Sequence, residues 1–81
     1  MNIYVGNLSY DLAESELQAK FEEFGSVKSV KIITDKDTGK SKGFGFVEME
    51  DQKAAQDAID GLNGQDLDGR ALKVNEARPR S

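Results

Sequence analysis

Apolar residues recur along this chain with two different spacings. In four short segments they alternate with polar or small residues every second position, which is typical of half-buried strands: residues 2–5, 27–33, 42–49 and 71–75. In two longer segments they recur every three to four positions, which indicates amphipathic helices over residues 12–24 and 52–62. The order predicted is therefore strand, helix, strand, strand, helix, strand.

This order is the split β-α-β-β-α-β pattern of ferredoxin-like folds. It predicts an α+β domain in which one four-stranded antiparallel sheet packs one face against two helices. Right-handed crossovers would place the first and third strands side by side in the middle of that sheet.

Local signals mark the ends of the elements. Ala13 stands where the first helix needs an N-cap and is a poor one, whereas Asp51 is a good N-cap for the second. Gly25 is expected to end the first helix as a C′ glycine, and Gly64 the second. Residues 67–70, Leu-Asp-Gly-Arg, carry a hairpin-turn signal before the last strand.

The third predicted strand has two unlike faces. With a two-residue period, one face carries Lys42, Phe44, Phe46 and Glu48, and the other Gly43, Gly45, Val47 and Met49. The glycines are expected to leave their face thin, so that a helix packs closely against it. The opposite face carries two aromatic rings and a cation.

The phenylalanines on that face could simply be core residues, since phenylalanine is often buried. The first strand argues against this, because Ile3 and Val5 share one face and Tyr4 lies on the other. If the two strands are neighbours, Tyr4, Phe44 and Phe46 form one aromatic patch on the face that no helix covers. Such a patch suits stacking of nucleic-acid bases.

Residues 42–49, Lys-Gly-Phe-Gly-Phe-Val-Glu-Met, resemble the RNP1 octamer of the RNA recognition motif (RRM) family. They match its pattern at every defined position except the last, where Met49 replaces an aromatic residue on the core-facing side. Residues 3–8, Ile-Tyr-Val-Gly-Asn-Leu, resemble the partner hexamer RNP2. The chain is similar to the small stand-alone RRM proteins of bacteria, especially cyanobacteria.

The resemblance implies that Tyr4 and Phe46 each stack a base and that Phe44 packs against sugars. It also implies that Lys42 pairs with a phosphate. The remaining contacts that it implies, to base edges and to the departing strand, come from Lys31, Lys73, Asn75 and the main chain around Ala77 and Arg78. Asn7, at the end of the RNP2 match, either hydrogen-bonds a base or braces its loop. Glu48 shares the RNA-facing side, where it would accept a hydrogen bond from a base amine or from Lys31.

The net charge of −4 argues at first against a nucleic-acid partner. Its distribution changes that conclusion. Residues 9–25 and 50–68, which contain the predicted helices, each hold one basic residue against five and six acidic ones. Residues 26–49 hold five lysines against three acids, and residues 70–81 hold four basic residues against one acid. The strands and the tail are therefore weakly basic.

Other functional classes find little support. The chain has no histidine and no cysteine, so common metal ligands and acid–base groups are missing, and no cofactor or metal is expected. Residues 34–41 resemble a calcium loop and a phosphate-binding loop only superficially, because required ligand and glycine positions differ. An acylphosphatase-like enzyme would need an arginine in residues 6–11, which contain none. The alternative that stays open is an RRM-like domain that binds another protein.

The 81 residues suffice for one small domain. We expect an RRM over residues 1–77 and a short tail over residues 78–81. The expected partner is single-stranded RNA, with weaker binding of single-stranded DNA. We further expect a non-enzymatic monomer in the cytoplasm, since no membrane-spanning or signal segment is evident.

Overall fold

A computed structural model describes residues 1–67 and 69–77, apart from the side chain of Ser41. It contains two helices and six strands, two of which form a small separate hairpin. The elements in chain order are β1 (Asn2–Gly6), α1 (Glu14–Glu22), β2 (Val27–Thr34), β3 (Ser41–Met49), α2 (Gln52–Leu62), β4 (Asp66–Leu67), β5 (Arg70–Ala71) and β6 (Lys73–Ala77). Within this part of the chain, no helix is long and apolar enough to cross a membrane.

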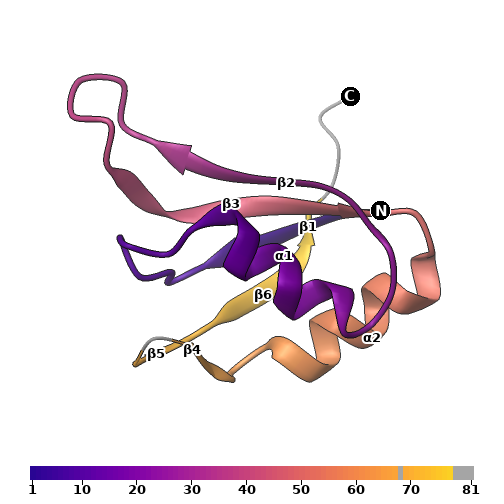
Figure 1. Ribbon diagram of the computed structural model, residues 1–81. Helices are drawn as coiled ribbons and strands as arrows, with labels where there is room; N and C mark the ends of the chain where they lie inside the picture. Colours follow the sequence, from indigo (N-terminus) through magenta and orange to yellow (C-terminus); the bar gives the residue numbers. More distant parts are fainter. Residues whose placement is uncertain (68, 78–81) are drawn as a thin grey trace.

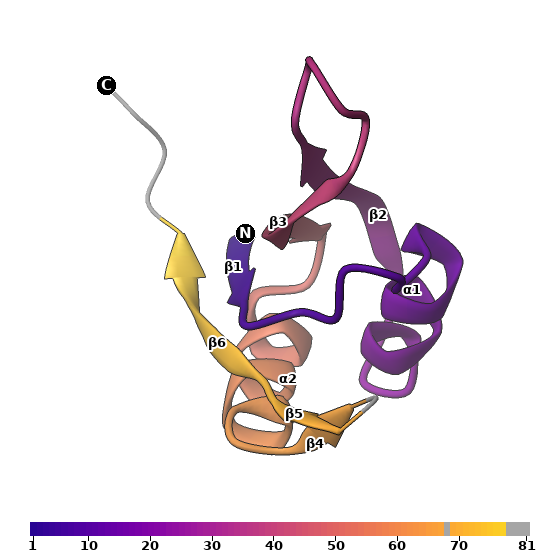
Figure 2. The ribbon, with the colours of Figure 1, turned by 90° about the vertical axis from the view of Figure 1, so that its left-hand side faces the viewer.

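The main sheet is antiparallel, with the strand order β2-β3-β1-β6. Both helices lie on one side of it (Figure 1), and β2 and β6 form its opposite edges (Figure 2). The first and third strands are therefore the central pair, as the crossover rule predicts. The predicted α+β split β-α-β-β-α-β fold is confirmed.

The core lies between the sheet and the helices. The inward residues of β1 and β3 are fully buried, as the alternation predicts, and Met49 is among them. Helix α2 contributes a stripe of small residues, and α1 two large ones, Leu17 and Phe21. No buried side-chain nitrogen or oxygen in the described residues lacks a hydrogen-bond partner. One face of the sheet is therefore buried in the core.

Both helices have the predicted N-cap residues, and α1 is shorter than the predicted span of residues 12–24. Ala13 makes no side-chain capping hydrogen bond, whereas Asp51 Oδ1 accepts one from the backbone N–H of Lys53 at 3.1 Å. The carboxylate of Glu14 has another role, because its Oε2 accepts a hydrogen bond from the backbone N–H of Ile32 at 2.9 Å. The first turn of α1 is therefore tied to β2 by a side chain that sequence reasoning assigned only to the helix dipole.

The predicted role of Gly25 as a C′ glycine is wrong. Helix α1 ends with Glu23 as its C-cap in a right-handed conformation, and Gly25 does not adopt a positive φ. A Cβ atom at Gly25 would instead lie 2.7 Å from the Cβ of Ala54 on α2. Gly25 is needed because the chain passes close to α2. Gly64, with a φ of +86°, does follow the end of α2 as predicted.

The expected reason for the glycines of β3 is also wrong. The nearest neighbours of a Cβ at Gly45 would be the backbone atoms of Lys31 and Ile32, and at Gly43 they would be Tyr10 and the carbonyl oxygen of Leu8. These neighbours belong to β2 and to the β1–α1 loop, not to a helix. Gly45 pairs directly with Ile32, and the register of β2 against β3 shifts just beyond this pair, between Ile32 and Thr34.

The predicted last strand, residues 71–75, is divided in the structure. The hairpin of β4 and β5 forms around the predicted turn, with Gly69 at a φ of +81°, while Asp68 lies outside the described residues. Leu72 separates β5 from β6 because its N–H donates to Gln65 and its carbonyl accepts from Gly64. The side chains follow the prediction: Leu72 is buried and Lys73 is exposed.

Each outer edge of the main sheet has a backbone N–H that donates to a side-chain oxygen. On β2 this is the bond from Ile32 to Glu14 described above. On β6 the N–H of Val74 donates to Asn63 Oδ1 at 3.1 Å. Unpaired edge groups favour pairing with other chains, so these contacts reduce the tendency of the sheet to extend.

We predict that Asn63→Ala lowers the free energy of unfolding by about 1–3 kcal/mol, because the partly buried N–H of Val74 loses its acceptor. Asn63→Asp, which keeps an oxygen at the same place, should lose much less. Urea denaturation of the three proteins measures the difference. Equal midpoints for the alanine and aspartate variants would show that this hydrogen bond does not stabilise the fold.

Candidate nucleic-acid interface

The strand register arranges the side chains of the uncovered face in three rows across the sheet. The first row, at the end of the sheet where β1 begins and β6 ends, consists of Ser29, Glu48, Asn2 and Ala77. The middle row consists of Lys31, Phe46, Tyr4 and Asn75. The third row consists of Phe44, Gly6 and Lys73. The aromatic residues thus occupy the two central strands, and polar or charged residues surround them.

Tyr4, Phe44 and Phe46 form one cluster of rings. Tyr4 lies with its centroid 6.1 Å from Phe44 and 6.0 Å from Phe46, and the two phenylalanine centroids are 6.2 Å apart. The phenylalanine planes are nearly perpendicular, at 89°. Phe46 is 39% exposed, while the residues behind it on the core side, Ile3 and Val47, are fully buried. The predicted aromatic patch therefore forms on the face opposite the helices.

Gly6 allows the ring of Tyr4 to lie low over its own strand. A Cβ at Gly6 would come within 2.5 Å of the Tyr4 hydroxyl oxygen and 3.0 Å of its ring. Any larger residue at this position would therefore lift or turn the tyrosine. The glycine of the RNP2-like hexamer thus has a direct role in the geometry of the aromatic patch.

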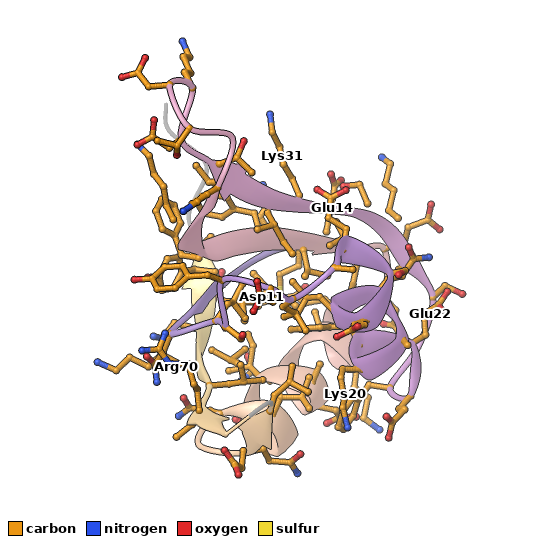
Figure 3. The ribbon with its side chains drawn as sticks, turned by 60° about the vertical axis from the view of Figure 1, so that its left-hand side comes forward. Asp11, Glu14, Lys20, Glu22, Lys31 and Arg70 are labelled. Carbon is orange, nitrogen blue, oxygen red and sulfur yellow. The ribbon has the colours of Figure 1, made fainter. Side chains whose placement is uncertain are left out.

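Three of the expected polar residues surround these rings. Lys31 lies opposite Phe46, Asn75 opposite Tyr4 and Lys73 opposite Gly6, and all three are exposed. Figure 3 shows Lys31 projecting from β2 away from the helices, whereas Lys20 and Glu22 lie on α1. The structure therefore brings these cations and amides to the edges of the aromatic patch.

Lys42 lies in an irregular part of β3. Gly43 has a φ of +84°, and between Ser41 and Gly45 the strand has three residues where β2 has only Ile33. The regular alternation expected for residues 42–49 therefore holds only from Phe44 onwards. Lys42 is exposed, but its direction does not follow from alternation.

Asn7 braces the loop that follows β1. Its side-chain nitrogen Nδ2 donates to the carbonyl oxygen of Ala71 at 2.7 Å. Its backbone has a φ of 59°, in the left-handed region that asparagine tolerates better than most residues. Of the two roles considered for Asn7, the structure shows the bracing one, and contact with a base stays a prediction.

The remaining predicted contacts lie at the C-terminal end of β6. Ala77 pairs with Asn2 and is half-buried at the end of the first row. Arg78, the other residue predicted there, lies outside the described residues. Ala77 therefore lies at the edge of the uncovered face.

A shallow hollow of about 280 Å³ lies at the first row, next to Phe46 of the middle row. It is lined by Asn2, Ser29, Lys31, Phe46, Val47, Glu48 and Ala77. Glu48 Oε2 lies 3.5 Å from Nζ of Lys28, so the structure pairs this carboxylate with Lys28 rather than with Lys31. The sequence did not suggest this pairing, because the register shift between Val27 and Ser29 is not visible in the alternation.

Sequence reasoning also missed a pair at the opposite end of the sheet. Tyr10, in the loop after β1, is 63% exposed, and the guanidinium carbon of Arg70 lies 5.5 Å from its ring centroid. Arg70 Nη1 also donates to the carbonyl oxygen of Leu8 at 3.3 Å. The signal in the sequence that could have revealed this pair was Tyr10, an aromatic residue in a polar loop. The pair fastens the β1–α1 loop to the β4–β5 hairpin.

The described residues contain no group of three or more histidine, cysteine, aspartate or glutamate side chains arranged to hold a metal ion. The uncovered face offers aromatic rings, cations, amides and the carboxylate of Glu48. These groups can stack on flat aromatic ligands, neutralise negative charge and form hydrogen bonds.

Comparison with known proteins gives a consistent result. The family model of the RNA recognition motif matches residues 3–73. The putative RNA-binding protein RbpA of Synechocystis is 55% identical over 80 residues, which cover 99% of this chain and 79% of that protein. The crystal structure of RNA-binding protein PG1 superposes with a TM-score of 0.95 at 51% identity, covering 100% of this chain and 98% of that one. The Sxl-lethal protein–RNA complex matches with a TM-score of 0.92 at 36% identity, covering 99% of this chain and 48% of that one.

We predict that Phe46→Ala lowers the free energy of unfolding far less than Phe21→Ala. Phe21 is fully buried, and removing such a ring costs about 3–5 kcal/mol. Phe46 is 39% exposed and packs chiefly on neighbouring rings, so its loss should cost about 1 kcal/mol. Chemical denaturation compares the two variants. A similar large loss in both would mean that Phe46 is a core residue.

Proposed function

The chain belongs to the RNA recognition motif family, and we propose that it binds single-stranded RNA on the uncovered face of its sheet. The observation that carries this proposal is the cluster of Tyr4, Phe44 and Phe46 on the face opposite the helices. Contiguous aromatic side chains that stay partly exposed on a small domain are typical of a binding site. Unpaired bases have the flat aromatic faces that such rings stack on.

The rings have different tasks in this proposal. Tyr4 and Phe46 each stack one base, because they stand side by side on the central strands in the middle row. Phe44 lies one row away, 6.1 Å from Tyr4, and packs against the sugars that connect the stacked nucleotides.

The basic residues bind the backbone and the base edges. Lys42 and Lys73 lie toward the loop end of the sheet and neutralise phosphates, while Lys31 and Asn75 flank the stacked bases at the two outer strands. Ala77 and Arg78 guide the strand past the end of β6, while Asn7 holds the loop after β1 at the opposite end of the sheet. Residues 9–25 and 50–68, which contain the helices and their flanking loops, hold eleven of the fifteen acidic residues, so phosphates are repelled from that side and attracted to this one.

The affinity that follows is modest. Stacking contributes about 1–3 kcal/mol per base, and two or three bases are engaged. The dissociation constant should therefore be roughly micromolar. Single-stranded DNA, which offers the same bases without 2′-hydroxyl groups, should bind more weakly.

Several properties accompany this proposal. Members of this family are RNA-binding proteins rather than enzymes, in agreement with the expectation of no catalytic role. We assign the RNA-binding domain to residues 1–77, with residues 78–81 as a tail, and propose that the chain acts as a monomer in the cytoplasm. The bonded edge groups on Ile32 and Val74 support a monomer.

We predict that the double variant Phe44→Ala/Phe46→Ala loses about 5- to 150-fold in affinity for a single-stranded RNA octamer, because Phe46 stacks one base and each stacked base contributes about 1–3 kcal/mol. Fluorescence anisotropy of labelled RNA measures the change, and circular dichroism verifies that the variant is folded. Tyr10→Ala is the matched control, since it removes an exposed ring outside the three rows and should change affinity less than threefold. Equal binding by the parent and the folded double variant would contradict the proposal and favour the protein-binding alternative.

We also predict a salt dependence that reports the phosphate contacts. For single strands the logarithm of the association constant falls with the logarithm of salt concentration by about 0.7 per phosphate contacted. Lys42→Ala/Lys73→Ala should therefore make this slope shallower by about 1.4. Lys53→Ala, on α2, should leave it unchanged. If Lys53→Ala reduces the slope as much as the double variant, the RNA lies over the helices.

A further inference from the structure

We propose that the hollow beside Phe46 makes the domain prefer guanine at the nucleotide that stacks on this ring. This inference rests on the proposed RNA binding and adds a base preference to it. The hollow adjoins Phe46 and has a volume of about 280 Å³. Pockets for drug-sized ligands measure roughly 300–1,000 Å³, so this one has the size for a single base rather than for a larger group.

The carboxylate of Glu48 is the first determinant of the preference. It lines the hollow from β3, and Lys28 holds its Oε2 at 3.5 Å from the side of β2. An ionised carboxylate only accepts hydrogen bonds, and it binds best to two neighbouring N–H groups. On the Watson–Crick edges of the four bases, only guanine offers two neighbouring donors, N1–H and the N2 amino group.

Lys31 is the second determinant. It lies opposite Phe46 in the middle row, whereas Glu48 lies one row away, opposite Ser29. Diagonal neighbours of this kind are roughly 7–8 Å apart between Cα atoms, with long side chains able to reach further. A base above Phe46 that turns its Watson–Crick edge toward β2 would meet Lys31 at one end and Glu48 at the other. The lysine ammonium can donate only, which suits O6 of guanine.

The same two groups disfavour the other bases. Uracil presents a single N–H between two carbonyl oxygens, and cytosine an amino group beside two acceptors. In either case an acceptor would face the carboxylate of Glu48 without a proton between them. Adenine has one amino group but no acceptor corresponding to O6 for Lys31. Selectivity here arises as much from these mismatches as from the guanine contacts.

The direct test compares four RNA pentamers that carry guanosine, adenosine, cytidine or uridine at the centre of otherwise uniform uridines. A good bidentate contact discriminates against wrong bases by about 5- to 150-fold. We expect a preference near the lower part of this range, about tenfold for guanosine, because the hollow is open to water. Fluorescence anisotropy at one fixed salt concentration gives the four dissociation constants.

Base analogues show which atoms of guanine are recognised. Inosine lacks only the N2 amino group, so its pentamer should lose most of the tenfold preference, which matches the loss of one of two donors. 7-Deazaguanosine keeps the whole Watson–Crick edge and should bind like guanosine. The opposite pattern, with inosine unaffected and the deaza analogue weakened, would mean that another edge of the base is read and would overturn the assignment.

Protein variants test the assigned residues. Glu48→Gln replaces one acceptor oxygen by an amino group and should reduce the preference for guanosine to less than about threefold, with binding of the uridine pentamer retained or improved. Lys31→Met should reduce the preference in the same direction. Glu76→Gln is the matched control. It removes the same charge from β6, at a position that pairs with the core residue Ile3 and lies outside the three rows. This variant should leave the preference intact.

The possible results distinguish this inference from the proposed function. If all four pentamers bind equally well and Phe44→Ala/Phe46→Ala abolishes the binding, RNA binding stands and the guanine assignment is wrong. A guanosine preference that survives Glu48→Gln also overturns the assignment. If none of the pentamers binds, both the proposed function and the guanine assignment fail.

Discussion

The register between β1 and β3 is the constraint on which the rest of this structure depends. Tyr4 lies opposite Phe46, and Ile3 lies opposite Val47, so every apolar core residue of the pair faces the helices and every ring faces away. A slip of one residue would exchange the two faces and bury the rings. Full burial of Ile3, Val5, Val47 and Met49 opposes such a slip. The core of the domain and the aromatic patch on its uncovered face are consequently two results of one pairing.

The face opposite the core gains its properties from what surrounds the rings. The rows place Lys31, Asn75 and Lys73 at the margins of the aromatic patch, while most of the acidic residues lie on or near the helices. The carboxylate of Glu48 is the exception, and it is paired with Lys28 instead of opposing a phosphate. In the proposed function, a weakly acidic protein thereby presents one face that attracts RNA, with affinity from stacking and direction from charge.

Sequence patterns predicted the elements, the strand order and the aromatic patch, because alternation and crossover handedness act over whole strands. They failed where contacts between distant segments decide the geometry. Gly25 looked like a helix terminator but is required by the approach of Ala54, and the glycine at position 45 lies against the backbone of β2. The irregular stretch around Lys42 and the pairing of Glu48 with Lys28 arise from register shifts. Such shifts depend on two strands at once, so one strand's alternation cannot reveal them.

The most direct measurement is a set of intermolecular nuclear Overhauser effects in the complex with single-stranded RNA. The account predicts contacts between base protons and the ring protons of Tyr4 and Phe46, with sugar protons close to Phe44. Amide shifts should change along β1 and β3 and stay constant in α1 and α2. Contacts confined to the helices, with the ring protons unperturbed, would contradict the claim that this domain binds RNA through the uncovered face of its sheet.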